Sequence, residues 1–410
     1  MPDIQPFRGL RYRVPDADLG KVLAPPYDVI TPPYQDELYA RDPRNIVRVV
    51  LNRTPGDAAY ADAKASFEAW QKDGLLTPDP APAFYVMEQK FNVEGRALTR
   101  LGILVRFRAE EAEKGMILPH EHTRKEAKED RYKLLKATKA NFSPIFLMLQ
   151  DDDHAVAQKL KALTAGTPTA SYSDDTEVVN RLFTVTDAAT IAWLTDAFAR
   201  RKAYIADGHH RYATALRYRD EVAGAEGAWT LGYFAPIGDP GMVVLPYHRL
   251  LSEGPSLDEA RKRLEGKFLL NEVKGVAAAA RDAANSTMPY AFALAEPGGR
   301  ALVCEALPEC ESLFDASTPA SLKALDTYFL HKVVLGPMLS IPDTAVSYVH
   351  SLAEAEEAVA HAKCRFAVLM RGTPVKQIVD VAEARESMPA KSTFFYPKLP
   401  SALVVHPLKA

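Results

Sequence analysis

The chain has 410 residues, of which 47% are hydrophobic and 25% charged, and its formal net charge at pH 7 is −3. This composition is typical of a soluble globular protein with two or three domains, and the slightly acidic balance argues against nucleic acid as a partner. No apolar run approaches the ~20 residues that cross a membrane, and the first residues do not form a signal peptide. We therefore expect a cytoplasmic protein without a membrane partner. The three cysteines are too few and too poorly spaced for a zinc site or a disulfide framework.

The first part of the chain, residues 1–110, is predicted to be an α/β unit. Its pattern predicts a strand over 45–52, a helix over 58–73 and a β-hairpin within 84–107. Earlier, prolines fix the loop Ala24-Pro25-Pro26-Tyr27-Asp28 in an extended form. This loop suits either a structural turn or one wall of a substrate site.

Polar residues gather in the stretch that follows. His120 and Glu121 end a loop, and a helix is predicted over 123–140, before a buried strand over 145–149. Helical spacing places Arg131 toward the apolar side of that helix. Because a buried arginine needs an anionic partner, we expect either an ion pair within the protein or a ligand phosphate at this position.

The densest group of polar residues follows the apolar segment 203–206, which reads as a buried strand before a predicted helix. The junction between strand and helix is Asp207-Gly208-His209-His210-Arg211. Gly208 permits a sharp turn and a close ligand, and the unpaired N–H groups of a helix start suit a phosphate. Arg211 adds a bidentate donor, and Asp207 is a candidate ligand for Mg²⁺. The alternative is an ordinary Asp-Gly turn with two ordinary histidines.

Beyond this turn, 230–237 and 242–251 are predicted to be paired strands, and a further α/β unit is predicted for the rest of the chain, with one long helix over 319–334. Near the end, the tail Lys391-Ser392-Thr393 precedes three aromatic residues between prolines. One positive charge beside two hydroxyls suits an anion-binding loop near a pocket. A tail packed on the core is the alternative.

Two chemistries fit these motifs. In the first, the turn binds nucleotide phosphates, Asp207 holds Mg²⁺, and Glu121 is the general base for an attacking hydroxyl. In the second, a metal centre performs hydrolysis. Its ligands would be His120, Glu121, His122, Asp207 and His209. No established metal-ligand spacing is present, and Arg211 would repel a second cation, so phosphate binding is favoured.

The strand that ends in Asp207-Gly208-His209-His210-Arg211 resembles the nucleotide-binding turn of the ParB/sulfiredoxin superfamily. The order of motifs is similar to that of the ADP-dependent free serine kinases of archaea. Pro119-His120-Glu121 resembles their catalytic segment, Tyr247 the start of their larger domain, and 389–393 their substrate loop. The ends of the chain are similar to a large bacterial family whose members are often called ParB-like.

This resemblance implies an α/β (α+β) fold with a nucleotide-binding core over 111–252, an additional unit over 1–110 and a substrate domain over 253–410. The kinases lack the unit 1–110. It also implies roles for individual residues. Glu121 and Asp207 would be catalytic, with Asp207 also the metal ligand. Phosphate or nucleotide would contact His120, Arg131, Gly208, His209, His210 and Arg211. The acceptor or the product phosphate would contact Lys391, Ser392 and Thr393.

The leading hypothesis is thus a nucleotide-dependent kinase of a small hydroxyl metabolite, with free L-serine as the candidate acceptor, ADP or ATP as the donor, and Mg²⁺ as the cofactor. A second hypothesis is a ParB-like nucleotide-binding switch or DNA-binding protein. The acidic balance and the lack of a clear helix-turn-helix speak against it. A third is a metal-dependent hydrolase.

Overall fold

A computed structural model describes residues 2–123, 125–222 and 225–408. The chain divides into two compact units. The first unit combines Met1–Pro119, Thr123–Val243 and Pro397–Ala410, and the second combines His120–His122 and Val244–Tyr396. The boundary predicted near residue 252 lies close to the one at 243, and the segment 1–110 packs in one unit with the residues that follow it. Both units mix helices with sheets, as an α+β fold requires.

The first unit is built on a mixed sheet with the strand order β6-β11-β8-β12-β5-β4-β10-β9, and β1 pairs with β5. The β11–β6 and β12–β8 pairs are parallel, and the others are antiparallel. The strands are β1 (Ile4–Gln5), β4 (Phe84–Val93), β5 (Arg96–Arg108), β6 (Ile117–Leu118), β8 (Ile145–Leu149), β9 (Ala170–Ser173), β10 (Val179–Val185), β11 (Ala203–Asp207) and β12 (Trp229–Pro236). The predicted hairpin and the strand over 145–149 are confirmed.

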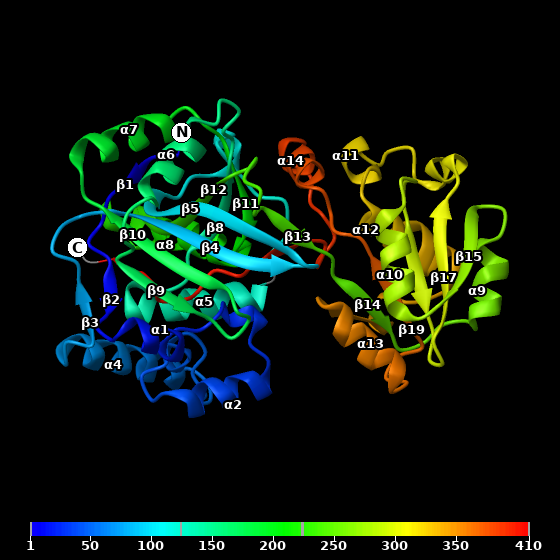
Figure 1. The fold of residues 1–410 in the computed structure, drawn as a ribbon, viewed down its shortest axis with the longest axis horizontal. Helices are drawn as coiled ribbons and strands as arrows, with labels where there is room; N and C mark the ends of the chain where they lie inside the picture. Colours follow the sequence, from blue (N-terminus) through cyan, green and yellow to red (C-terminus); the bar gives the residue numbers. More distant parts are fainter. Residues whose placement is uncertain (1, 124, 223–224, 409–410) are drawn as a thin grey trace. The chain divides into compact units, whose positions relative to one another are not determined.

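Helices cover this sheet, and short strand pairs lie beside it (Figure 1). Apolar side chains of α6, α7 and α8 share one buried core with the sheet, and α5 packs against α8. The helices are α1 (Asp16–Val22), α2 (Pro32–Arg41), α3 (Val47–Val50), α4 (Ala58–Lys72), α5 (Lys125–Thr138), α6 (Ala155–Leu163), α7 (Ala188–Phe198) and α8 (His209–Glu221). The short strand pairs are β2 (Leu10–Tyr12) with β3 (Leu76–Pro78), and β7 (Ala140–Asn141) with β21 (His406–Pro407).

The prediction of a strand over 45–52 is wrong, because this segment forms the short helix α3. The side chain of Asn45 explains the difference. Its Nδ2 donates to the carbonyl oxygens of Lys21 and Leu23, and its Oδ1 accepts from the backbone N–H of Val47 at 2.9 Å. These bonds fix a helical turn, and tertiary packing thus overrides the strand preference of the β-branched residues.

The second unit holds a six-stranded sheet with the order β15-β17-β16-β19-β14-β18. Helices α10 and α13 share one buried cluster with the sheet, and α9, α12 and a π-helix share another (Figure 1). The strands are β14 (His248–Leu251), β15 (Phe268–Lys274), β16 (Phe292–Ala295), β17 (Arg300–Ala306), β18 (Val346–Val349) and β19 (Phe366–Met370), and β13 (Val243–Leu245) pairs with β20 (Phe394–Tyr396). The helices are α9 (Leu257–Leu264), α10 (Val276–Asn285), α11 (Ala320–Lys323), α12 (Asp326–Phe329), the π-helix Leu330–Met338, α13 (Leu352–Ala360) and α14 (Val375–Glu383).

Two further sequence predictions are wrong. The strands predicted at 230–237 and 242–251 do not pair with each other, since β12 pairs with β5 and β8, and β14 pairs with β18 and β19. The turn that follows β12 is instead held on β5, where the backbone N–H of Leu101 donates to Asp239 Oδ2 at 3.1 Å. The helix predicted over 319–334 is divided into α11, α12 and the π-helix. Arg371 pairs with Asp326 at the start of α12 and fixes this division.

The finding on membrane spans is limited to the described residues: none of their helices combines the length and the apolar character needed to cross a bilayer.

Two buried histidines, His248 and His406, and the largely buried His331 make the stability of the fold dependent on pH. Burial, together with the charge of Arg249, lowers the pKa of His248 and of His331 to about 4, and burial also lowers the pKa of His406 to about 3. In the unfolded chain these groups titrate near 6.5. Below that pH the unfolded state binds protons that the folded state does not, so stability falls as the pH drops toward 4.

We therefore expect the free energy of unfolding to fall by several kcal/mol between about pH 7 and about pH 5, since each histidine loses about 1.4 kcal/mol per pH unit. Urea unfolding at both values measures this loss. His331→Gln should reduce the loss by about a third, since it removes one of three such groups. His361→Gln, at an exposed position, should leave it unchanged. A loss of stability that does not respond to His331→Gln would contradict the assignment.

Candidate functional site

The predicted strand–glycine–helix turn is present in the first unit. The apolar residues of β11 are buried between β6 and β8, and the strand ends at Asp207, where its register with β8 shifts. Gly208 follows with φ +93°, a left-handed conformation that favours glycine. Helix α8 then begins at His209. The first turn of α8 therefore lies directly after the carboxyl end of a buried strand.

Gly208 also leaves room for Arg211. A Cβ atom at position 208 would lie 3.0 Å from the guanidinium of Arg211. We therefore expect Gly208→Ala to lower the free energy of unfolding by about 1–2 kcal/mol, through the left-handed backbone alone, and to displace Arg211 as well. Denaturant unfolding measures the effect. Gly166→Ala is the matched control, because a Cβ there would meet nothing within 4 Å. Equal effects of the two substitutions would contradict this account.

Two cationic side chains meet at the carboxylate of Asp207. Arg211 Nη2 donates to Oδ2 at 2.8 Å, and Lys398 Nζ donates to Oδ1 at 3.2 Å. Arg211 also donates to the carbonyl oxygen of Pro144. Both cationic side chains are only 12–13% exposed. The cluster of Asp207, Arg211 and Lys398 therefore carries one net positive charge beside the start of α8.

The environment of Asp207 keeps it ionised. Burial by itself would raise the pKa of this carboxyl, but the charges of Lys398 and Arg211 outweigh burial and hold the pKa well below its usual range. Both carboxylate oxygens accept hydrogen bonds from cations in this structure, and the role of Asp207 as a Mg²⁺ ligand stays a prediction. Within the described ranges, no three His, Cys, Asp or Glu side chains are grouped so that they could hold a metal ion. The geometry suits a positioning role, in which Asp207 orients Arg211 and Lys398.

The other residues predicted to bind the nucleotide differ in their surroundings. His209 is buried at the start of α8, and His210 beside it is half-buried. Arg131, on α5, donates from Nε to Asp130 Oδ2 at 2.7 Å and from Nη1 to the carbonyl oxygen of Val50 at 2.8 Å. The sequence predicted that Arg131 would meet either a carboxylate of the protein or a ligand phosphate. The structure contains the carboxylate, which belongs to Asp130.

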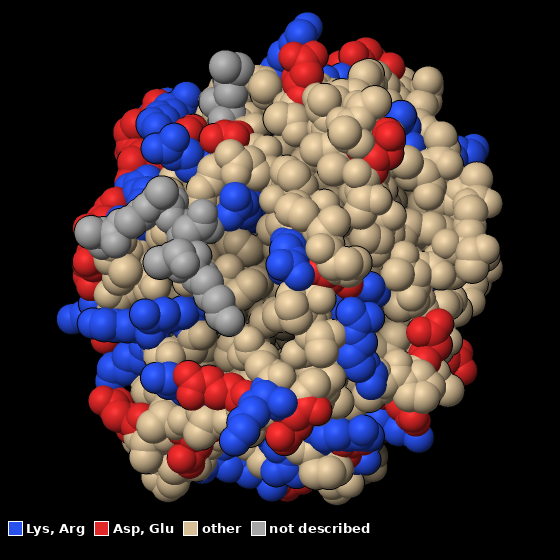
Figure 2. Space-filling view, turned by 90° about the vertical axis from the view of Figure 1, so that its left-hand side faces the viewer, with Lys and Arg blue, Asp and Glu red and all other residues tan. Residues whose placement is uncertain are grey.

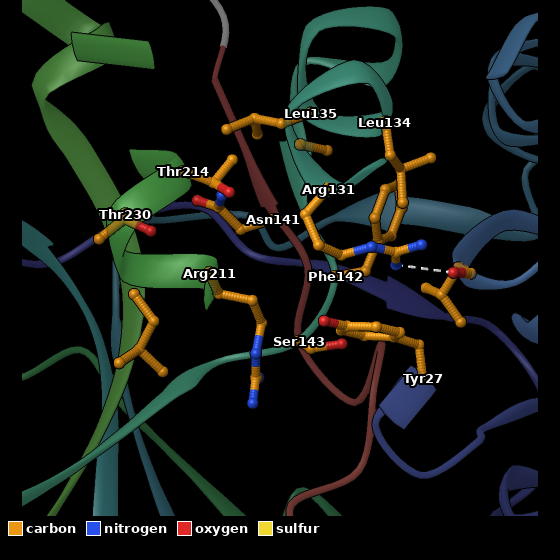
Figure 3. Close-up of a pocket in the computed structure, with 13 residues that line it drawn as sticks. Tyr27, Arg131, Leu134, Leu135, Asn141, Phe142, Ser143, Arg211, Thr214 and Thr230 are labelled. Atoms are coloured by element: carbon orange, nitrogen blue, oxygen red, sulfur yellow. Dashed lines mark hydrogen bonds between the residues drawn. The ribbon is translucent and has the colours of Figure 1, made fainter. Parts of the chain in front are cut away.

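Arg131 and Arg211 both line a pocket of the first unit, which encloses about 500 Å³ including its open mouth. The guanidinium of Arg131 lies over the ring of Tyr27, 4.0 Å from the ring centroid. Figure 3 shows this stacked pair on one side of the pocket and Arg211 on the other. The pocket thus adjoins the turn between β11 and α8 through Arg211.

The predicted base lies in the second unit. Glu121 forms a parallel bridge with Met388, whose backbone N–H donates to the carbonyl oxygen of His120 at 2.8 Å. The hydroxyl of Thr393 donates to Glu121 Oε1 at 3.4 Å. The Glu121 side chain is 26% exposed, and its Oε1 lies 4.0 Å from Nε2 of the buried His120. Predicted residues from two separate motifs, His120 and Glu121 from one and Thr393 from the other, are thus brought together, with a partly exposed carboxylate beside a hydroxyl.

The tail residues of the second unit form an ordered loop. Lys391 has φ +59°, and its Nζ lies 3.4 Å from the hydroxyl of Tyr247. The buried Ser392 hydroxyl donates to the carbonyl oxygen of Pro389 at 2.7 Å, and its oxygen lies 3.2 Å from Thr327 Oγ1. The contacts of Ser392 therefore stabilise the loop. The side chain of Lys391 contacts Tyr247, and that of Thr393 contacts Glu121.

Sequence reasoning missed two basic residues. Lys398 reaches Asp207 from 191 positions away, and its only signal was a second lysine in the aromatic tail. Arg249 is fully buried on β14. It donates from Nη2 to the carbonyl oxygen of Lys391 at 3.4 Å and from Nη1 to the carbonyl oxygen of Tyr247. An arginine inside an otherwise apolar strand was the available signal for it.

A buried strand, a left-handed glycine, a helix start and two convergent cations define a mixed α/β protein with a cationic cluster at a strand–glycine–helix turn. Residues 4–328 match the model of the family described as protein of unknown function, DUF1015. Because the match spans most of the 410 residues, the chain belongs to this family. No curated protein matches the chain.

Solved structures with some likeness to this chain include a free serine kinase variant in complex with AMP, at 13% identity and a TM-score of 0.35, over 74% of this chain and 92% of that one. A conserved hypothetical protein from Pyrococcus furiosus has 13% identity and a TM-score of 0.34, over 74% and 95%. Truncated SbnI from Staphylococcus aureus has 10% identity and a TM-score of 0.36, over 74% of this chain and 87% of that one. TM-scores of this size do not establish a shared fold, and the ParB/sulfiredoxin resemblance stays a prediction.

Proposed function

We propose that this chain is a nucleotide-dependent phosphotransferase that acts on a small hydroxyl metabolite. The observation that carries the proposal is the convergence of Arg211 and Lys398 at the turn between β11 and α8. A guanidinium fork, an ammonium group and the positive end of the α8 helix dipole suit the oxygens of a diphosphate or triphosphate. A phosphate group bound there would replace Asp207 as the partner of these cations.

In this proposal the second unit binds the acceptor. Glu121 is a partly exposed carboxylate, and a general base needs access to the proton that it removes. Thr393 orients that carboxylate, and Lys391 supplies a positive charge for an anionic end of the acceptor. The sequence resemblance to the ParB/sulfiredoxin superfamily and the free serine kinases assigns the same roles, with L-serine as the first acceptor to test.

The proposed reaction is a displacement at phosphorus. Glu121 accepts the proton of the acceptor hydroxyl while the hydroxyl oxygen forms a bond to the terminal phosphorus of the donor. The bond from that phosphorus to the bridging oxygen breaks, and the shortened nucleotide leaves with the electron pair. Arg211 and Lys398 stabilise the negative charge on the phosphate oxygens.

Thermal unfolding with ADP, ATP and CTP, each with and without Mg²⁺, tests the proposal on the full chain. A nucleotide at about 100 times its dissociation constant should raise the stability by about 2.7 kcal/mol. The nucleotide that binds is then incubated with L-serine and other hydroxyl compounds, and phosphorylated product is measured. If no nucleotide shifts the unfolding transition, the proposal fails.

The DNA-binding alternative receives less support from the surface. On the face in Figure 2, Lys and Arg side chains lie interspersed with Asp and Glu. A duplex-binding face needs basic side chains gathered along the path of the phosphates. A mobility-shift assay with duplex DNA at low salt separates the two hypotheses, because only the DNA-binding protein retards the duplex.

A further inference from the structure

The pocket beside Arg211 has walls that the proposed phosphate turn does not use. Its apolar lining includes Val50, Leu134 and Phe142, and its polar lining includes Asn141, Ser143, Thr214 and Thr230. Among the described residues that line it, the only charged ones are Arg131 and Arg211. The pocket therefore presents two guanidinium groups and no carboxylate of its own lining to a ligand, and each guanidinium pairs with a carboxylate next to the pocket.

One wall of the pocket is a rigid flat surface. Tyr27 is the first residue of a 3-10 turn (Tyr27–Val29) that directly follows Pro26. The Arg131 guanidinium lies 4.0 Å from the centroid of the Tyr27 ring. Arg131 is itself held by Asp130 and by the carbonyl oxygen of Val50, and the dashed line in Figure 3 marks the bond to Val50. Because both partners of the stack are fixed, the wall requires little ordering when a planar group packs against it.

The rim of the pocket supplies hydrogen-bonding groups. Asn141 Oδ1 accepts from the backbone N–H of Leu231 at 3.2 Å and lies 3.0 Å from His406 Nδ1. Within the described ranges these bonds engage Oδ1, so Nδ2 stays available as a donor. The Ser143 hydroxyl shares a hydrogen bond with Ser401, and the hydroxyl of Tyr27 points toward Ser143 in Figure 3. Such groups match the ring nitrogens and exocyclic atoms of a nucleobase.

We infer that this pocket binds the planar base of the nucleotide whose phosphates lie at Arg211. The inference rests on the proposed function and adds the residues that select the nucleotide. Two of these residues, Tyr27 and Val50, come from the amino-terminal segment 1–110. That segment thereby provides a wall of the nucleotide site, and Tyr27 is its main contact through stacking on the base.

A comparison of nucleotides with inorganic pyrophosphate tests the inference, because pyrophosphate has the phosphates without the base. Isothermal titration calorimetry with the full chain should show that one nucleotide among ADP, ATP and CTP binds at least 10-fold more tightly than pyrophosphate. Tyr27→Ala should weaken that nucleotide by about 5- to 100-fold and leave pyrophosphate within 2-fold. Tyr27→Phe, which keeps the ring, should stay within about 3-fold for both ligands.

Two further variants keep the test interpretable. Tyr27→Leu preserves apolar packing without the ring and should show the same selective loss as Tyr27→Ala, if the latter does not fold. Tyr39→Ala removes a tyrosine of α2 that stacks with Arg48 and Arg53 and does not line the pocket. This control should bind nucleotide and pyrophosphate like the wild type.

The outcomes separate this inference from the proposed function. If pyrophosphate binds as tightly as every nucleotide, the pocket does not hold the base, and the phosphate turn still stands. If Tyr27→Leu weakens both ligands equally, Tyr27 supports the turn and not the base, and the inference is again overturned. If neither nucleotide nor pyrophosphate binds, the proposed function fails and the inference fails with it.

Discussion

Replacement of Glu121 by glutamine should lower the rate of phosphoryl transfer by about 10²- to 10⁴-fold, the contribution of a positioned general base. Glutamine has the same shape and keeps an oxygen to accept the hydrogen bond of Thr393, which the structure shows at 3.4 Å from Glu121. It cannot accept the proton of an attacking hydroxyl. The affinity for nucleotide should stay within about 2-fold, because the turn that binds the phosphates is formed by other residues.

Single-turnover measurement of product formation, with nucleotide affinity from calorimetry, checks this expectation. Glu126→Gln is the matched control, since Glu126 is an exposed carboxylate in the first turn of α5. It should keep wild-type activity. Full activity in the Glu121→Gln variant would remove Glu121 as the base and leave the nucleotide site untouched.

Arg211→Lys should weaken nucleotide binding by about 10- to 100-fold, although the charge is retained. The guanidinium reaches Asp207 Oδ2 and the carbonyl oxygen of Pro144 with two different nitrogens, and this orientation presents a fork to phosphate oxygens. A lysine ammonium group is a point charge that loses the bidentate contact, which is worth about 1.5–3 kcal/mol for hydrogen bonds to charged groups. Calorimetry with nucleotide and with pyrophosphate should show the same loss for both ligands.

The matched control for this substitution lies on the same helix. Arg217 is 40% exposed on α8 and pairs with Glu129 and Glu221. Arg217→Lys should leave the affinity unchanged. Equal effects at positions 211 and 217 would show that the loss at 211 came from a general change in α8, and a wild-type affinity for Arg211→Lys would remove Arg211 from the phosphate site.

Where local sequence determines local structure, the predictions succeeded. The apolar runs of β8 and β11 and the glycine between β11 and α8 were predicted from periodicity and turn chemistry alone. The prediction for the segment 45–52 was wrong, because the conformation of this segment is set by hydrogen bonds from Asn45 to residues more than 20 positions earlier. No pattern within the segment carries that information.

The candidate site divides in the same way. The turn at Asp207 was visible as a short motif, whereas Lys398 was not, because its partner lies 191 positions away in the sequence. The contact of Glu121 with Thr393 spans 272 positions. Only the resemblance to a family associated these two motifs beforehand. The loop at Tyr27 was predicted to be either a structural turn or one wall of a substrate site. In the structure, the ring of Tyr27 stacks with the guanidinium of Arg131.

The first unit is completed by Pro397–Ala410, a segment that the ribosome synthesises after the whole of the second unit. While the chain is being made, Asp207 and Arg211 are therefore present long before Lys398 can join them. The nascent turn has one cation on its carboxylate instead of two, and the three-residue cluster forms only after residue 398 has been added. The pairing of both Asp207 oxygens with cations is thus coupled to the synthesis of the whole second unit, and a chain interrupted before residue 397 would lack it.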